Sequence, residues 1–144
     1  MSRRDARTHA FYLVFQFPFH NPFTREALAE AYSFHKENLP EDIPVAALSD
    51  FQENAYAERV VNGVFSELET IDGVINKYLK DWALQRINRV DLAILRLSVY
   101  ELLFEPGIPA GATINEAVEL AKLYGADESP AFINGVLGGV SRDE

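Results

Sequence analysis

The chain has 144 residues, of which 48% are hydrophobic and 12% aromatic, a composition that suits one globular domain over 1–144 and excludes a disordered chain. The formal net charge of −9 argues against a protein that coats nucleic acid non-specifically. The absence of cysteine excludes disulfides and thiolate metal sites, and with no signal peptide and no bilayer-length apolar run we expect a cytoplasmic protein without membrane association.

The N-terminus combines a basic segment with the start of a helix. Arg3, Arg4 and Arg7 lie within five positions and run directly into a helical apolar pattern that Pro18 ends. Cations are mildly unfavourable at a helix N-terminus, so this placement is either a tolerated, solvated helix end or an arm kept for a polyanion. Both interpretations stay open at this point.

The second quarter of the chain predicts a helix over 25–38 and a loop over 39–47. Ser49 and Gln52 then form a capping box that opens a long helix. The segment 71–78 either continues this helix or forms a separate short one. The apolar residues with core spacing in the long helix are Tyr56, Val60, Val64, Leu68 and Ile71.

The segment 88–104 is apolar nearly all round, which is typical of a helix buried inside a bundle. Asn88 can cap its N-terminus, and Pro106 followed by Gly107 ends it. Each of its charged interior residues either reaches solvent or a local partner, or lies at a protein interface. These residues are Asp91, Arg96 and Glu101.

Two further helices are predicted after this segment. A capping box that begins at Thr113 predicts a helix over 114–124, which Gly125 ends. Ser129 followed by proline predicts the N-cap and first residue of the last helix. The apolar residues of that helix are Phe132, Ile133, Val136, Leu137 and Val140. Because no segment alternates as a strand does, the fold class is all-α, with about seven helices.

The sequence contains no catalytic or metal-binding pattern. The three histidines, His9, His20 and His35, have no metal-ligand spacing, and neither a nucleotide-binding loop nor a hydrolase motif is present. The glycine-rich run 135–139 follows no strand, so we interpret it as helix packing or fraying. We therefore expect no enzymatic activity, no metal and no cofactor.

Four runs of residues together resemble the NusB family of bacterial transcription antitermination factors. They cover the N-terminal helix and nearly all of 82–140, whereas 20–60 carries little resemblance. The runs are Arg3-Arg4-x-Ala6-Arg7, the segment from Asp91 to Leu102, Ile114 to Gly125 (INEAVELAKLYG), and Phe132 to Leu137 (FINGVL).

The resemblance implies a compact all-α bundle of two packed helical sub-bundles without enzymatic activity. It implies binding to boxA-type single-stranded RNA in nascent ribosomal RNA transcripts, together with the ribosomal small-subunit protein NusE. The pair would join an RNA polymerase antitermination complex that reads through terminators. The oligomeric state stays open, a homodimer included.

Carried over by position, the resemblance also implies site residues. Tyr100 and Glu101 fall in the region that docks the protein partner. The turn 125–130 carries acids at 127 and 128 and no lysine. The total of 22 acidic against 13 basic residues predicts weak RNA binding by this chain alone. For each of the two aromatic rings, Tyr124 and Phe132, stacking on RNA bases and packing in the core both stay open. The RNA-facing positions are Arg3, Arg4, Arg7, Tyr124, Glu128 and Phe132.

Two alternative functions follow from the same residues. One is a non-catalytic helical adaptor that binds only proteins. The other is an RNA-binding module related to that of ribosomal RNA methyltransferases, which resembles NusB in fold. Loss of RNA binding after neutralisation of the arginine arm, with the fold intact, would separate the antitermination factor from the adaptor.

Overall fold

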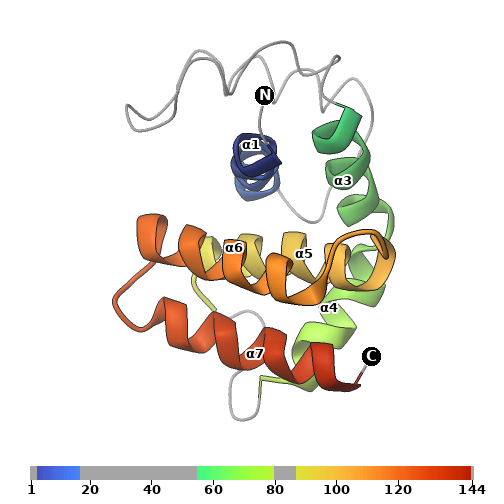
Figure 1. The fold of residues 1–144 in the computed structure, drawn as a ribbon. Helices are drawn as coiled ribbons and strands as arrows, with labels where there is room; N and C mark the ends of the chain where they lie inside the picture. Colours follow the sequence, from blue (N-terminus) through green and yellow to red (C-terminus); the bar gives the residue numbers. More distant parts are fainter. Residues whose placement is uncertain (1–2, 17–54, 80–86, 144) are drawn as a thin grey trace. The chain divides into compact units, whose positions relative to one another are not determined.

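The computed structural model describes residues 3–16, 55–79 and 87–143. These residues form six helices and contain no strand, which confirms the all-α prediction (Figure 1). The chain divides into two compact units, Met1–Ser66 and Glu67–Glu144, and each is considered by itself. The helix predicted over 25–38, the loop over 39–47 and the capping box at Ser49 lie outside the described residues.

The first unit contains helix α1, Arg3–Gln16, and helix α3, Ala55–Ser66, which pack against each other. The apolar spacing seen in the sequence gives each helix one buried face. That face consists of Ala6, Ala10, Phe11, Leu13 and Val14 from α1, and Val60, Val61 and Val64 from α3. The basic segment at the N-terminus is thus part of α1 from its first residue, because the helix begins at Arg3.

The long helix predicted after Ser49 is interrupted. Helix α3 ends at Ser66, and helix α4, Leu68–Lys77, begins two residues later. Glu67 between them has φ −109° and ψ 19°, which is outside helical values and lies near the bridge region. The long helix was predicted to include Leu68 and Ile71, which is wrong because both belong to α4. Of the two alternatives left open for 71–78, the separate short helix is the one observed as far as Lys77. The interruption coincides with the boundary between the two units.

The second unit is organised around helix α5, Arg89–Phe104, which packs against α4, α6 and α7. Every residue from Asp91 to Glu101 is buried, as predicted for a helix that is apolar nearly all round. Helices α6, Ala110–Tyr124, and α7, Ser129–Asp143, lie side by side and are joined by a short turn (Figure 1). Asn88 caps α5 as predicted, since its side chain accepts a hydrogen bond from the Asp91 N–H at 2.8 Å.

The buried Arg96 of α5 has its charge partner on α4. Its Nε donates to Oδ1 of Asp72 at 2.8 Å, and its Nη2 donates to Oδ2 of the same carboxylate at 2.7 Å. Such paired contacts fit the planar guanidinium group and orient it. For Arg96, the interpretation that a charged residue of this helix finds a local partner is therefore confirmed.

Helix α6 begins one turn earlier than predicted. It starts at Ala110, and Pro109 occupies the N-cap position with extended backbone angles and no side-chain hydrogen bond. The carbonyl oxygen of Pro109 accepts the N–H groups of Ala112 and Thr113 at 3.0 and 3.2 Å. The capping box at Thr113 was therefore a wrong prediction, because the chain is already helical there and the Thr113 side chain is buried inside the unit.

Two glycines of α7 offer a matched test of the glycine-rich run. A Cβ at Gly139 would lie 2.8 Å from Cδ1 of Tyr78, whereas a Cβ at Gly135 would meet nothing within 4 Å. We expect Gly139→Ala to lower the free energy of unfolding by about 1–3 kcal/mol through overpacking. Gly135→Ala should raise it by about 0.5–1 kcal/mol through helix propensity. Urea titrations of both variants would check this, and equal changes would contradict the packing role of Gly139.

Candidate nucleic-acid interface

Residues 125–128 connect helices α6 and α7 and are called the α6–α7 turn below. Backbone hydrogen bonds fix both of its ends. The Gly125 N–H donates to the Ala121 carbonyl at 2.9 Å, and the Ser129 N–H donates to the Ala126 carbonyl at 3.0 Å. The turn is therefore a defined element that sets the spacing between the last residue of α6 and the first residues of α7.

Gly125 is required in this turn by a close approach. Its φ of −94° and ψ of −173° are extended, so the left-handed conformation common after helices is not the reason for glycine here. A Cβ at this position would lie 2.7 Å from Cβ of Ser129 and 2.8 Å from the carbonyl oxygen of Ala121. Only a residue without a side chain lets Ser129 come this near to the end of α6.

Ser129 opens α7, but its hydroxyl acts in a different direction from that predicted. An N-cap side chain normally accepts an N–H from the first turn of its own helix. Here Ser129 Oγ accepts the N–H of Ala126 at 2.9 Å, on the side of the turn. The side chain is buried, and it closes the α6–α7 turn onto the start of α7.

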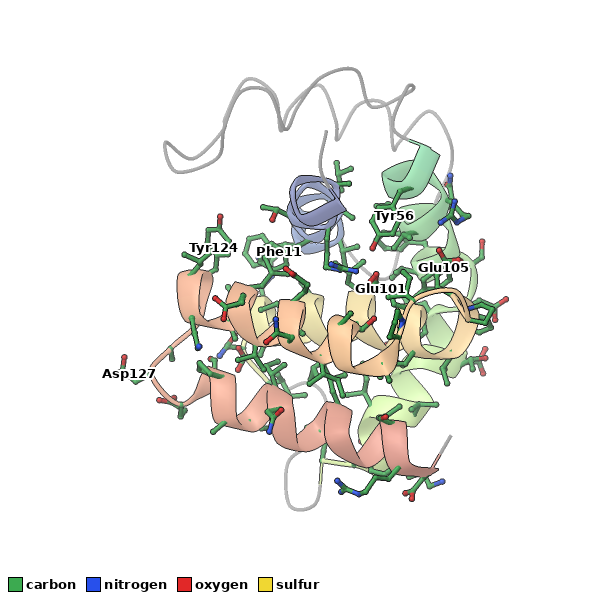
Figure 2. The ribbon with its side chains drawn as sticks, viewed as in Figure 1. Phe11, Tyr56, Glu101, Glu105, Tyr124 and Asp127 are labelled. Atoms are coloured by element: carbon green, nitrogen blue, oxygen red, sulfur yellow. The ribbon has the colours of Figure 1, made fainter. Side chains whose placement is uncertain are left out.

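Three of the residues predicted to face RNA lie around this turn. Tyr124 is the last residue of α6, Glu128 ends the turn, and Phe132 lies in the first turn of α7. Glu128 is exposed, while both rings are half-buried, so each ring combines packing with an accessible part. In Figure 2, Tyr124 extends from the end of α6 and Asp127 points away from the helices at the tip of the turn.

Asp91 at the N-terminus of α5 lies close enough to Glu128 and Ser129 to be affected by them. Oδ2 of the buried Asp91 accepts a hydrogen bond from Nδ2 of Asn88 at 3.1 Å. Burial raises the pKa of Asp91 and the nearby Glu128 charge raises it further, while interactions with the Ser129 hydroxyl and the Asn88 amide oppose these effects. Oδ1 of Asp91 is buried without a hydrogen-bond partner. Sequence reasoning identified Asn88 as the N-cap and Asp91 as a first-turn residue, but it did not place Ser129 near Asp91.

The predicted arginine arm is divided by the structure. Arg3 and Arg4 lie in the first turn of α1, and their side chains are outside the description. Arg7 is buried, with 3% of its surface exposed. The interpretation of all three arginines as one solvated helix end is therefore wrong for Arg7, because Arg7 lies on a buried face of α1.

The two residues predicted to dock a protein partner are also buried. Glu101 has no exposed surface, and Tyr100 is 7% exposed. The ring of Tyr100 stacks on that of Phe104 with 5.3 Å between centroids, and Phe104 is partly exposed at the end of α5. Phe104 therefore supplies the accessible part of this aromatic pair, whereas Glu101 has no exposed surface.

The described residues contain neither a metal-binding cluster nor a membrane-spanning helix. The described part of the chain holds no group of three or more His, Cys, Asp or Glu side chains that could bind a metal ion. None of its helices is long and apolar enough to cross a bilayer. A shallow groove between α6 and α7 has only apolar and amide lining: Gly111, Ile114, Asn115, Val118, Pro130, Ala131 and Asn134.

The described residues define an all-α protein that places aromatic and acidic side chains around one turn between two helices. Comparison with known proteins makes the class specific. The NusB family model matches residues 4–142. A transcription antitermination protein NusB from Bacillus pumilus is 38% identical over 143 residues, covering 99% of this chain and 97% of that protein. The chain belongs to the NusB family, which confirms the resemblance of its sequence motifs.

Solved structures give the same result for the fold. NusB from T. maritima is 34% identical, with a TM-score of 0.75 over 100% of this chain and 93% of that one. A crystal structure of the antitermination factors NusB and NusE in complex with double-stranded RNA contains a chain that is 26% identical to this one. Its TM-score is 0.75, and the match covers 99% of this chain and 97% of that one.

Proposed function

We propose that this chain is a transcription antitermination factor that binds boxA-type RNA in nascent ribosomal RNA together with NusE. The observation that carries the proposal is its similarity, over 99% of its length, to a NusB chain crystallised with NusE and RNA. The protein would act without catalysis, in the cytoplasm, as part of an RNA polymerase complex that reads through terminators. A relative named as a transcription antitermination protein supports the same role.

Within this role we assign the accessible parts of Tyr124 and Phe132 to stacking on unpaired bases, which is how proteins read single-stranded RNA. The exposed Glu128 carboxylate can accept hydrogen bonds from base amino groups. Arg3 and Arg4 are assigned to phosphates, because arginine makes paired hydrogen bonds to phosphate oxygens. Since Arg7 is buried, its proposed contribution is to the packing of α1 rather than to phosphate binding.

The charge of the chain makes a partner necessary for tight binding. A net charge of −9 repels a polyanion, so affinity for RNA should be weak without a basic protein beside it. NusE would supply the missing positive charge. In this proposal the buried Tyr100 and Glu101 support the partner-binding surface. Phe104, which stacks on Tyr100 and is partly exposed, makes the direct contact with the partner.

The test is a titration of labelled boxA-type RNA with this protein, in the absence and in the presence of NusE. We expect NusE to increase the affinity for RNA about 5- to 150-fold, the usual range of coupling between two binding events. Single-stranded boxA RNA, the same sequence as a duplex and a scrambled strand should be compared, because the solved relative holds double-stranded RNA.

Each result separates the proposal from an alternative. Equal dissociation constants with and without NusE would exclude a shared RNA-binding surface. Binding of NusE without any RNA binding would favour the helical adaptor. Equal affinity for boxA and scrambled strands would leave an RNA-binding protein without the proposed sequence preference.

A further inference from the structure

We propose that Ser129 and Gly125 are positioning residues for RNA binding, because together they hold the α6–α7 turn in one conformation. The held turn sets the separation of Tyr124 and Phe132. This role rests on the proposed function, since these two rings are the ones assigned to RNA bases. Ser129 has no exposed surface, so it acts on RNA only through the residues around it.

The middle of the α6–α7 turn is not held by apolar packing. Ala126, Asp127 and Glu128 are all exposed, and Asp127 points away from the helices at the tip of the turn (Figure 2). An exposed connection of this kind samples several conformations unless hydrogen bonds fix its backbone. The order of the turn therefore depends on the hydrogen bonds and close contacts at its two ends.

Two hydrogen bonds join Ala126 to Ser129. The Ala126 N–H donates to Ser129 Oγ at 2.9 Å, and the Ser129 N–H donates to the Ala126 carbonyl at 3.0 Å. The Gly125 N–H donates to the Ala121 carbonyl at 2.9 Å and connects this pair to α6. Of these three bonds, the one to Oγ is the one made by a side chain. Ser129 is therefore the residue at which a substitution can release the turn.

Gly125 leaves the space that Ser129 needs for this bond. A Cβ at Gly125 would lie 2.7 Å from both Cβ and Oγ of Ser129, and 2.8 Å from the Ala121 carbonyl oxygen. The crowded Oγ is the same atom that accepts the Ala126 N–H. Because the Ala121 carbonyl belongs to the backbone of α6, it is the Ser129 side that must move away from an added Cβ. An alanine at position 125 should therefore break the hydrogen bond between Ala126 and Ser129.

The conformation of the turn matters for RNA because both rings are attached to its ends. Tyr124 directly precedes Gly125 in the chain. The Phe132 N–H donates to the Glu128 carbonyl at 3.1 Å, which connects the first turn of α7 to the end of the α6–α7 turn. With the turn fixed, the two rings keep one separation before RNA binds. A site ordered in advance loses less affinity to the entropy of ordering, so release of the turn should weaken binding without removing a contact to RNA.

The first experiment measures hydrogen exchange of the Ala126 amide by NMR, because this N–H reports directly on the bond to Ser129. Ser129→Ala removes the acceptor, so we expect exchange to be about three- to tenfold faster. Thr113→Val is the matched control. Thr113 is also buried, but its Oγ1 has no hydrogen-bond partner, so the Ala126 amide should exchange as in the wild type. Wild-type exchange in Ser129→Ala would overturn the role of Ser129 in holding the turn.

The second experiment measures affinity for boxA-type RNA in the presence of NusE. Ser129→Ala should weaken binding about three- to tenfold at an unchanged salt slope, because no phosphate contact is lost. Gly125→Ala should weaken it about tenfold. Its control is Gly135→Ala, since a Cβ at Gly135 meets nothing within 4 Å, and this variant should bind RNA as the wild type does. Affinity for NusE without RNA should stay constant in all three variants, which a general loss of folded protein would not allow.

A double-mutant cycle separates positioning from an independent effect. The separation of two rings has no influence once one ring is absent, so Ser129→Ala should change RNA affinity by less than about twofold in a Phe132→Ala background. The full three- to tenfold loss in that background would overturn the positioning role while RNA binding by the wild type stands. Failure of the wild type to bind RNA with NusE would instead overturn the proposed function. If Gly125→Ala does not fold, Ser129→Ala and this cycle decide the question.

Discussion

Replacing Leu95 with alanine is expected to lower the free energy of unfolding by about 2–5 kcal/mol, the largest effect on stability among the changes considered. Leu95 lies in the middle of α5 and has no exposed surface. Helix α5 contacts three other helices of its unit, so little of the space left by the lost atoms can close.

The matched control is Leu123→Ala in α6. Leu123 is 67% exposed, and its removal should change stability by less than about 0.5 kcal/mol. Thermal or urea unfolding of the two variants, followed by circular dichroism, measures the difference. Similar midpoints for both would contradict the placement of α5 at the centre of the second unit.

The helices that could be predicted are those whose signals are local and strong. The segment 88–104 has apolar residues on all sides, an N-cap asparagine and a proline after its end, and the structure has α5 at Arg89–Phe104. Every level of the pattern favours the same result there. The last helix was predicted equally well, since Ser129 and Pro130 mark its start and its apolar residues are buried with the exception of the half-buried Phe132.

The errors arose where a local motif competed with its surroundings. Thr113 begins a sequence that fits a capping box, but Pro109 provides an earlier start, and the Thr113 side chain is buried within the unit. No glycine or proline lies at the interruption at Glu67, so the sequence does not predict it. It falls where one compact unit ends and the next begins, a boundary that tertiary packing determines.

The candidate site could be predicted only in part. Tyr124, Glu128 and Phe132 are near one another in sequence, so one turn brings them together in the structure. The proximity of Ser129 to Asp91 involves distant parts of the chain, and no local pattern predicts it. The burial of Arg7 likewise depends on what covers the face of α1 that it occupies, whereas its neighbours in the sequence suggested a solvated cation.

Removal of Arg3 and Arg4 together should weaken RNA binding in a way that depends on salt. Each phosphate contact with single-stranded RNA contributes about 0.7 to the slope of log K against log salt, so Arg3→Ala/Arg4→Ala should reduce the slope by about 1–1.5. Arg7 is left in place because its burial would add a stability effect. The control removes two exposed cations assigned no RNA contact, Lys77 and Arg142, and changes the net charge equally.

Phe132→Ala should affect RNA binding in a different manner. Stacking of a base on an aromatic ring contributes about 1–3 kcal/mol, so affinity should fall about 5- to 150-fold. The salt slope should stay constant, since loss of stacking changes no phosphate contact. Phe132→Leu keeps an apolar side chain without the aromatic face and should lose most of the same affinity, while the helical content of both variants matches the wild type. RNA titrations at several salt concentrations measure both quantities. Wild-type affinity in Phe132→Leu would assign the ring to packing. For the arginine prediction, a salt slope that is unchanged in Arg3→Ala/Arg4→Ala would exclude Arg3 and Arg4 from the RNA interface.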